Sequence, residues 1–220
     1  MTKTEIAYHR LSEMIETGQL AAGTVLSEAQ LMELVEIGRT PLREATQRLS
    51  RDHLVKLRPG SGIEVPSLSV DEQLARLEVR RSLEMLAVGL ACHRGTPEQL
   101  EEIAAHARVL DGISNVTDYI AGVRKSHWLI CEATNNQYLA DAMTPLQGLS
   151  RRFWLAHITD EKREIRQGRE FYGAALRAVV ARDEEQARQG IQGLNDHLVN
   201  SALEVARRLA DQGRAQADQT

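Results

Sequence analysis

The sequence contains only two cysteines among its 220 residues, Cys92 and Cys131, and neither belongs to a C-x-x-C pair. Two isolated thiols cannot build a disulfide framework or a cysteine-based metal site. Long hydrophobic runs are also absent. No stretch approaches the about 20 apolar residues of a transmembrane helix, and the first residues lack the apolar core of a signal peptide. We therefore expect a cytoplasmic protein without membrane contact.

An excess of positive charge is missing as well. The chain has 27 Lys and Arg residues against 31 Asp and Glu residues, a net charge of -4. This balance excludes a polybasic protein that coats nucleic acid, although one basic face is enough to contact DNA phosphates. Apolar residues make up 42% of the chain, which is enough to bury a core, and the length favours two domains.

The first 66 residues predict a small domain of helices followed by a hairpin. We predict three short helices, over residues 4–16, 28–35 and 40–52. Ser27 has the side chain to cap the second helix, and Gly18 suits the end of the first. The glycine-rich turn after residue 58 predicts a hairpin with strands over 54–57 and 63–66, the only strands that we predict. A linker follows at residues 67–70.

The remainder of the chain predicts helices only, so the fold class is mainly α. The predicted spans are 71–93, 97–111, 116–134, 136–158, 161–182 and 183–211, and a polar tail follows at 212–220. Three helices show apolar residues at helical spacing. These stripes are Val79, Leu83, Leu86 and Leu90, then Ile120, Val123, His127 and Ile130, and finally Ile165, Tyr172, Leu176 and Val179.

A local basic region lies between residues 39 and 58, which contain six basic and two acidic residues and so carry a local charge of +4. Arg39 and Thr40 stand at the start of the third predicted helix, and Arg43 follows one turn later. An N-terminal turn of this kind suits a DNA major groove, because arginine binds guanine edges and the helix dipole favours phosphate. The alternative is a solvated face on which Arg43 interacts with Gln47.

The order of residues favours DNA binding. The segments LSEAQL at 26–31 and GRTPLREA at 38–45, followed by QRL and LV, resemble the GntR family of bacterial repressors. The resemblance covers residues 5–66. It implies a winged helix-turn-helix over residues 1–66, with the hairpin as the wing. The expected DNA contacts are Arg39, Thr40, Arg43, Arg48, Arg58 and Gly60.

The sequence departs from the family pattern around the turn before the third helix. The family usually has Leu-Gly-Val-Ser there, whereas this chain has VEIG at 35–38. Glu36 replaces a turn glycine and is expected to adopt a left-handed conformation. Gly38 replaces a capping Ser or Thr, His53 replaces another glycine, and Ala29 stands where some relatives have a basic residue.

The helices after residue 70 resemble the FCD domain, the C-terminal domain of one GntR subfamily. The residues on which this resemblance rests are LEVRRSLE at 77–84, His127, ATNN at 133–136, RD at 182–183 and HL at 197–198. The resemblance implies an antiparallel all-α bundle over residues 71–211 that dimerises and binds a small organic acid. We therefore expect a homodimer on a palindromic operator and a carboxylate-type effector.

Many FCD domains hold a metal with one Asp and three His ligands. In this sequence the corresponding positions are Val123, His127, Tyr172 and His197, so two of the four ligands remain. A stable zinc site normally needs three or four protein ligands. We expect no metal cofactor. The alternative is a weak divalent metal site, such as zinc, on His127 and His197.

The predicted effector site consists of Arg80, His127, Tyr172 and His197. Arg80 either points inward to meet a carboxylate or forms a surface pair with Glu84 four residues later. Arg151 and Arg152 are weaker candidates for the same role.

The main prediction is thus a DNA-binding regulator, acting as a repressor. One alternative is a small helical metal-dependent enzyme that uses His127 and His197. The sequence offers it no nucleophile motif, phosphate loop or complete metal set. A helical scaffold protein with an incidental basic hairpin is the third possibility.

Overall fold

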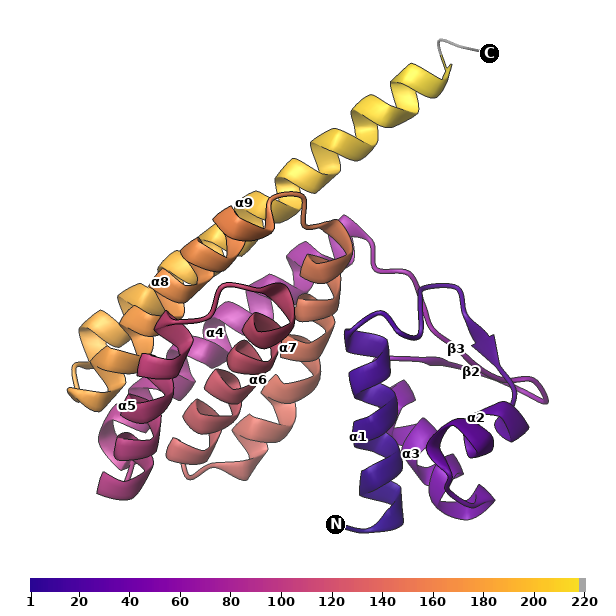
Figure 1. Cartoon of the computed structure of the whole chain (residues 1–220), viewed down its shortest axis with the longest axis horizontal. Helices are drawn as coiled ribbons and strands as arrows, with labels where there is room; N and C mark the ends of the chain where they lie inside the picture. The colour runs from indigo at the N-terminus through magenta and orange to yellow at the C-terminus, as the bar shows by residue number, and fades with distance from the viewer. Residues whose placement is uncertain (218–220) are drawn as a thin grey trace. The chain divides into compact units, whose positions relative to one another are not determined.

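The computed structural model describes residues 1–217 of the chain and divides it into two compact units (Figure 1). The first unit consists of Met1–Ser69 together with Pro145–Ala156, and the second comprises the rest. The chain passes from the first unit to the second between Ser69 and Val70, within the predicted linker at residues 67–70. The assignment of 145–156 to the first unit was not predicted. In the described part of the chain, no helix is long and apolar enough to cross a membrane.

The first unit contains three helices and a small antiparallel sheet, in agreement with the predicted winged helix-turn-helix. The helices are α1 (Lys3–Glu16), α2 (Glu28–Val35) and α3 (Arg39–Arg51), and the strands are β1 (Val25–Leu26), β2 (Lys56–Arg58) and β3 (Gly62–Glu64). The strand order is β1-β3-β2, with Ile63 opposite both Leu26 and Leu57. The prediction of only two strands was incomplete, because β1 adds a third, and the hairpin strands are shorter than predicted.

Local signals in the sequence set the ends of these helices. Ser27 accepts a hydrogen bond from the backbone N–H of Gln30 and begins α2, as predicted. Glu36 at φ 55° and His53 at φ 60° both adopt the left-handed conformation where the family has glycine. Gly38 precedes α3 without a side-chain cap. The departures from the family pattern therefore change the local chemistry and leave the turn geometry intact.

One hydrophobic core holds the first unit together, and it includes a residue from the segment 145–156. Leu11, Leu42 and Leu49 are fully buried in this core, and Leu149 belongs to the same cluster. Arg151 forms an ion pair with Glu16 at 2.9 Å, in which each side chain is 10% exposed. The inward-facing pair with Glu16 indicates a structural role for Arg151 rather than the effector role for which the sequence makes it a candidate. The neighbouring Arg152 likewise donates a hydrogen bond to a backbone carbonyl, that of Pro66.

The second unit is the predicted all-α bundle. Its helices are α4 (Val70–Arg94), α5 (Pro97–Asp111), α6 (Val116–Ala133), α7 (Gln137–His157), α8 (Glu161–Val180) and α9 (Glu184–Ala217), with the second half of α7 assigned to the first unit. Figure 1 shows α9 running along α8 and continuing well past it. The last helix ends at Ala217 rather than at residue 211, so most of the predicted polar tail is helical. Residues 218–220 lie outside the described residues.

The apolar stripe predicted on α4 is not its buried face. Val79 is 50% exposed and Leu86 is 44% exposed. The face that packs against α6, α8 and α9 instead contains Leu77, Ala87 and the polar residue Arg80. A hydrophobic pattern identifies an amphipathic helix but not the element that covers it. In a single chain the Val79–Leu86 face is therefore left uncovered.

A buried histidine that the sequence analysis did not single out lies between α5 and α6. The Nε2 atom of His106 lies 3.0 Å from the carbonyl oxygen of Gly122 and 3.0 Å from the hydroxyl of Ser126. Burial lowers the pKa of His106, and the nearby charge of Lys125 adds to that effect. His106 is therefore neutral in the folded protein at neutral pH.

We expect His106 to make the fold less stable in mild acid. Because its pKa is lower in the folded than in the unfolded chain, the unfolded chain binds the proton first, from about pH 6.5 downward. Its stabilising contribution is complete above that pH and is lost as the pH falls. Urea unfolding at pH 7.5 and pH 5.5 should show a smaller decrease in the free energy of unfolding for His106→Gln than for the natural protein. The substitution His53→Asn, at an exposed histidine, is the control and should leave the decrease unchanged.

Candidate functional site

The exposed N-terminal turn of α3 presents two arginines on one face. Arg39 and Arg43 are four residues apart, and their side chains are 68% and 65% exposed. Both approach the carboxylate of Glu28 at the start of α2. The Arg43 Nε atom lies 2.5 Å from Glu28 Oε1, and the Arg39 Nε atom lies 3.9 Å from Oε2. This carboxylate raises the pKa of Arg43 and, through two hydrogen bonds, orients the Arg43 guanidinium group.

The predicted alternative for Arg43, an interaction with Gln47, is not what the structure contains. Arg43 donates two hydrogen bonds to Glu28, at 2.5 and 3.1 Å. Exposed ion pairs of this kind contribute little to stability and are screened by salt, so DNA phosphates and bases can replace the carboxylate. The role of Glu28 was missed from sequence, because nothing in the sequence pattern links two residues 15 positions apart.

The other predicted DNA contacts on α3 have different surroundings. Thr40 is exposed in the first helical turn. The Arg48 guanidinium lies 4.2 Å from the centre of the Tyr8 ring, a cation–π contact between α3 and α1. Nine residues separate Arg48 from Arg39, which is about two and a half helical turns, so the two side chains leave α3 on opposite sides. Arg48 as a DNA contact stays a prediction, and it does not share the face of Arg39.

The wing turn is built on two glycines with left-handed backbone angles. Gly60, at φ +71°, lies at the exposed tip, and a Cβ there would meet nothing within 4 Å. Gly62, at φ +101°, is also required by space, because a Cβ would overlap the carbonyl oxygen of Leu26 in β1. Arg58 precedes the turn and pairs with Glu64 across the hairpin. The wing therefore presents a narrow, exposed backbone with one partly balanced arginine.

The second unit contains a buried polar network. Arg80 and Glu84 of α4 are each 3% exposed, and Arg80 Nη2 lies 2.7 Å from Glu84 Oε1. Asn195 of α9 donates a hydrogen bond of 2.9 Å to the other Glu84 oxygen. Burial by itself lowers the pKa of Arg80, but Glu84 and Tyr172 outweigh it and the pKa lies above its usual value. Arg80 thus points inward and meets a carboxylate, as the first alternative predicts, but that carboxylate is Glu84, and the pair is buried rather than on the surface.

His127 and Tyr172 belong to the same network. The His127 Nε2 atom lies 2.7 Å from the Tyr172 hydroxyl and 3.7 Å from Glu84 Oε1. Three of the four predicted effector residues, namely Arg80, His127 and Tyr172, are therefore brought together. Sequence reasoning missed Asn195, for which no pattern offered a signal. It treated Glu84 only as a surface partner, although Glu84 lies at the centre of the network.

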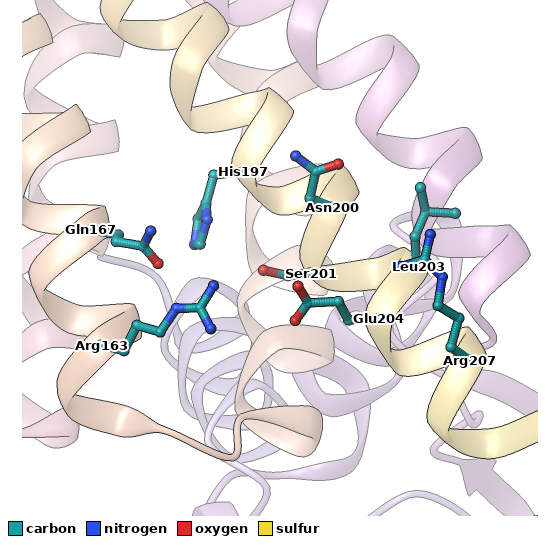
Figure 2. Close-up of a pocket in the computed structure, with 8 residues that line it drawn as sticks. All are labelled: Arg163, Gln167, His197, Asn200, Ser201, Leu203, Glu204 and Arg207. Carbon is teal, nitrogen blue, oxygen red and sulfur yellow. The ribbon is translucent and has the colours of Figure 1, made fainter. Parts of the chain in front are cut away.

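The fourth predicted residue, His197, has a different hydrogen-bond partner. Its Nε2 atom lies 3.0 Å from Glu164 Oε2, and its side chain is 10% exposed. It lines a pocket of about 270 Å³ between α8 and α9, which Figure 2 shows in close-up. The complete lining is Arg163, Gln167, His197, Asn200, Ser201, Leu203, Glu204 and Arg207. The helical unit therefore offers a buried polar network and a pocket that His197 lines.

The metal site of other FCD domains does not fit the residues of this chain. Val123 is 5% exposed in the apolar core and offers no oxygen ligand. His127 and His197, the two remaining candidate ligands, bond to Tyr172 and Glu164 respectively. Within residues 1–217, no three His, Cys, Asp or Glu side chains are grouped so that they could hold a metal ion. We therefore derive no function through a metal.

Solved structures of similar fold confirm the architecture. "E. coli McbR/YncC" aligns with a TM-score of 0.80 and 23% identity, covering 93% of this chain and 98% of that one. A putative transcriptional regulator GntR from Rhodococcus sp. RHA1 aligns with a TM-score of 0.70 and 19% identity, covering 94% and 98%. At these identities the likeness establishes the fold.

Three curated relatives are transcriptional regulators. The uncharacterized HTH-type transcriptional regulator YdhC of Bacillus subtilis (strain 168) is 26% identical over 146 residues, which cover 64% of this chain and 65% of that protein. The fatty acid metabolism regulator protein of Yersinia enterocolitica is 33% identical, covering 45% and 49%. The HTH-type transcriptional repressor GlaR of Escherichia coli (strain K12) is 25% identical, covering 85% and 90%. The match spans less than two thirds of the length of the first two relatives.

Family profiles match both units. The description "Bacterial regulatory proteins, gntR family" matches residues 3–65, and "FCD domain" matches residues 75–198, which is more than half of the chain. The curated relatives are transcriptional regulators, so the alternative of a helical enzyme is not supported. The chain belongs to the GntR family of bacterial transcriptional regulators and combines a DNA-binding winged helix-turn-helix with an FCD domain.

Proposed function

We propose that this DNA-binding regulator is a homodimeric repressor of the cytoplasm, where its operator DNA lies, and that a small carboxylate modulates its operator binding. The observation that carries the proposal is the pair of exposed arginines, Arg39 and Arg43, at the open N-terminal turn of α3. A pair in this position can donate bidentate hydrogen bonds to guanine edges. The name of one relative, the repressor GlaR, supports the choice of repression.

The test is a gel shift of the purified full chain on the DNA upstream of its own gene, with and without small carboxylates. We expect a specific complex whose apparent dissociation constant changes with at least one carboxylate. An effector can produce such a change only through different affinities for two states of the protein. Absence of a specific complex on that DNA would contradict the regulator proposal. A complex that is indifferent to every carboxylate would contradict the effector part alone.

The uncovered face of α4 supports the homodimer. Ala75, Val79, Ser82 and Leu86 are all exposed, and their spacing of four, three and four residues places them in one line along the helix. One α3 helix recognises only a few base pairs, so two copies on a two-fold symmetric operator recognise twice as many. A line with three apolar members, Ala75, Val79 and Leu86, is costly to leave in water and suits a second copy of the same helix.

We expect a dimer at micromolar concentration in sedimentation experiments, and a monomer after the double substitution Val79→Glu and Leu86→Glu. In a symmetric interface each new carboxylate would meet another negative charge. Val109→Glu is the matched control, because Val109 is 63% exposed on α5 and lies off this face. A monomeric natural protein, or a double variant that remains dimeric, would refute the assignment of α4.

The proposed effector contacts begin with the residues identified from sequence, Arg80, His127, Tyr172 and His197. The carboxylate of Glu84 already occupies Arg80, which is the interaction that an effector carboxylate would need. An effector at Arg80 must therefore displace Glu84, whereas the pocket beside His197 is open. This contrast favours the His197 side for first contact with a ligand.

We also propose that the protein holds no tightly bound metal. Elemental analysis of protein purified without chelator should give well below one zinc or nickel ion per chain. Two histidines that bond to different partners leave a divalent cation without the three or four ligands that it needs. About one metal ion per chain, lost in His127→Ala or His197→Ala, would overturn this proposal.

A further inference from the structure

The pocket between α8 and α9 is lined by Gln167, whose side-chain oxygen lacks a hydrogen-bond partner among the described residues. The Oε1 atom of Gln167 is buried and accepts no hydrogen bond from the residues that the structure describes. Buried polar atoms in folded proteins nearly always have a partner, so an orphaned acceptor that lines a pocket needs a donor from outside the chain. A ligand hydroxyl or ammonium group would supply it.

Two guanidinium groups line the same pocket. Arg163 comes from α8 and Arg207 from α9, and neither forms an ion pair within residues 1–217. In the view of Figure 2 they lie on opposite sides of the pocket, with Ser201 and Glu204 between them. Guanidinium groups bind carboxylates through paired hydrogen bonds. Two arginines on opposite sides suit a ligand with a carboxylate at each end.

The remaining lining favours a ligand that also donates hydrogen bonds. Glu204 contributes a carboxylate, and His197 is already bonded to Glu164 at 3.0 Å. A purely anionic ligand without a donor would leave Gln167 unsatisfied. The volume of about 270 Å³ lies just below the range of about 300 to 1,000 Å³ typical of pockets for drug-sized ligands, which fits a small metabolite.

We propose that the α8–α9 pocket binds a short-chain dicarboxylate that bears a hydrogen-bond donor on the carbon chain. Arg163 and Arg207 bind its two carboxylates, and Gln167 accepts the hydrogen bond of its hydroxyl or ammonium group. Binding at this pocket does not require DNA. Only its consequence for the operator rests on the proposed function, of which it specifies the effector class.

Malate, aspartate and succinate form a matched series of probes, because they differ only in the hydroxyl, ammonium or hydrogen at one carbon. Isothermal titration of the full chain without DNA, at constant ionic strength, should show that malate or aspartate binds about tenfold or more tightly than succinate. Whichever of the two binds more tightly identifies the donor. Equal affinity for succinate, or no binding of any of the three, would overturn the proposal.

Variants assign the binding to this pocket. Arg163→Gln and Arg207→Gln should each weaken binding about tenfold or more, and Gln167→Leu should remove the preference over succinate. Arg177→Gln is the matched control, since it removes an exposed α8 arginine whose partner is Asp111 outside the pocket. Unchanged thermal unfolding midpoints in all variants separate loss of binding from loss of fold. Unchanged malate and aspartate affinity in Arg163→Gln would sink the assignment.

The gel shift separates this proposal from the proposed function. If malate or aspartate binds the natural protein, fails to bind Arg163→Gln and leaves operator affinity unchanged, the pocket stands and the effector part of the proposed function fails. If a carboxylate changes operator affinity equally in the natural protein and in Arg163→Gln, the proposed function stands and the pocket assignment fails.

Discussion

Arg39→Ala and Arg43→Ala should each weaken operator binding about tenfold or more while leaving the thermal unfolding midpoint unchanged. Each substitution removes an exposed arginine from the first turns of α3, where a base-edge contact is made in a major groove. Fluorescence anisotropy with labelled operator DNA, at one fixed salt concentration, measures the loss. The fold should persist, because neither side chain is part of the buried core of the first unit.

The type of contact can be separated from its strength. Removing an arginine that binds a base edge reduces the protein's discrimination between operator and unrelated DNA. Removing a phosphate contact instead weakens binding to both DNAs and lowers the salt dependence of binding. Arg48→Ala, on the opposite side of α3, should therefore have the smaller effect on discrimination. Arg177→Ala, in the helical unit, controls for the loss of one positive charge and should leave binding unchanged. Operator affinity that is unaffected in both Arg39→Ala and Arg43→Ala would remove α3 from the interface.

Sequence predicted the DNA-binding unit well, because its signals are local. The capping of α2 by Ser27 depends on residues three positions apart, and the left-handed backbone at Glu36 follows from the missing glycine. Strand β1 has only two residues, Val25 and Leu26, which is too short for any alternation to be visible. Its existence depends on pairing with β3, a contact between residues nearly 40 positions apart.

In the helical unit, a periodic apolar pattern does not predict which face of a helix is buried. The spacing of Val79 and Leu86 predicts an apolar face correctly, but not whether the same chain covers that face. The buried face of α4 instead contains the charged residues Arg80 and Glu84. Their spacing of four residues predicts the ion pair, whereas their burial depends on α6, α8 and α9 packing over them.

The placement of His197 shows the limit of a family resemblance. In relatives that hold a metal, the ion itself draws the ligand side chains to one point. Val123 removes one ligand from this chain and Tyr172 replaces another, so no shared ion holds the two histidines together. His127 then bonds to Tyr172, and His197 bonds to Glu164. Chain position alone therefore did not predict these two partners.

Glu84→Ala should lower the free energy of unfolding by about 3–5 kcal/mol. The substitution leaves the Arg80 guanidinium buried without its carboxylate and removes one of the two acceptors of the Asn195 amide. Restoring charge balance should recover most of the loss, because apolar side chains of similar volume often replace a buried ion pair without net cost. The double variant Arg80→Met and Glu84→Leu should therefore be more stable than Glu84→Ala alone.

Urea unfolding at pH 7.5, followed by circular dichroism, measures both variants against the natural protein. The exposed pair Arg177–Asp111, with side chains 55% and 53% exposed, provides the matched control, since removing Asp111 leaves a solvated arginine and should change stability little. If Glu84→Ala is as mild as Asp111→Ala, water must reach Arg80 and the network is not sealed. The double variant provides a second test. If the network is sealed from water, Glu84→Ala is less stable than the double variant. If the network is hydrated, the order is reversed, because the two apolar side chains replace solvated charges.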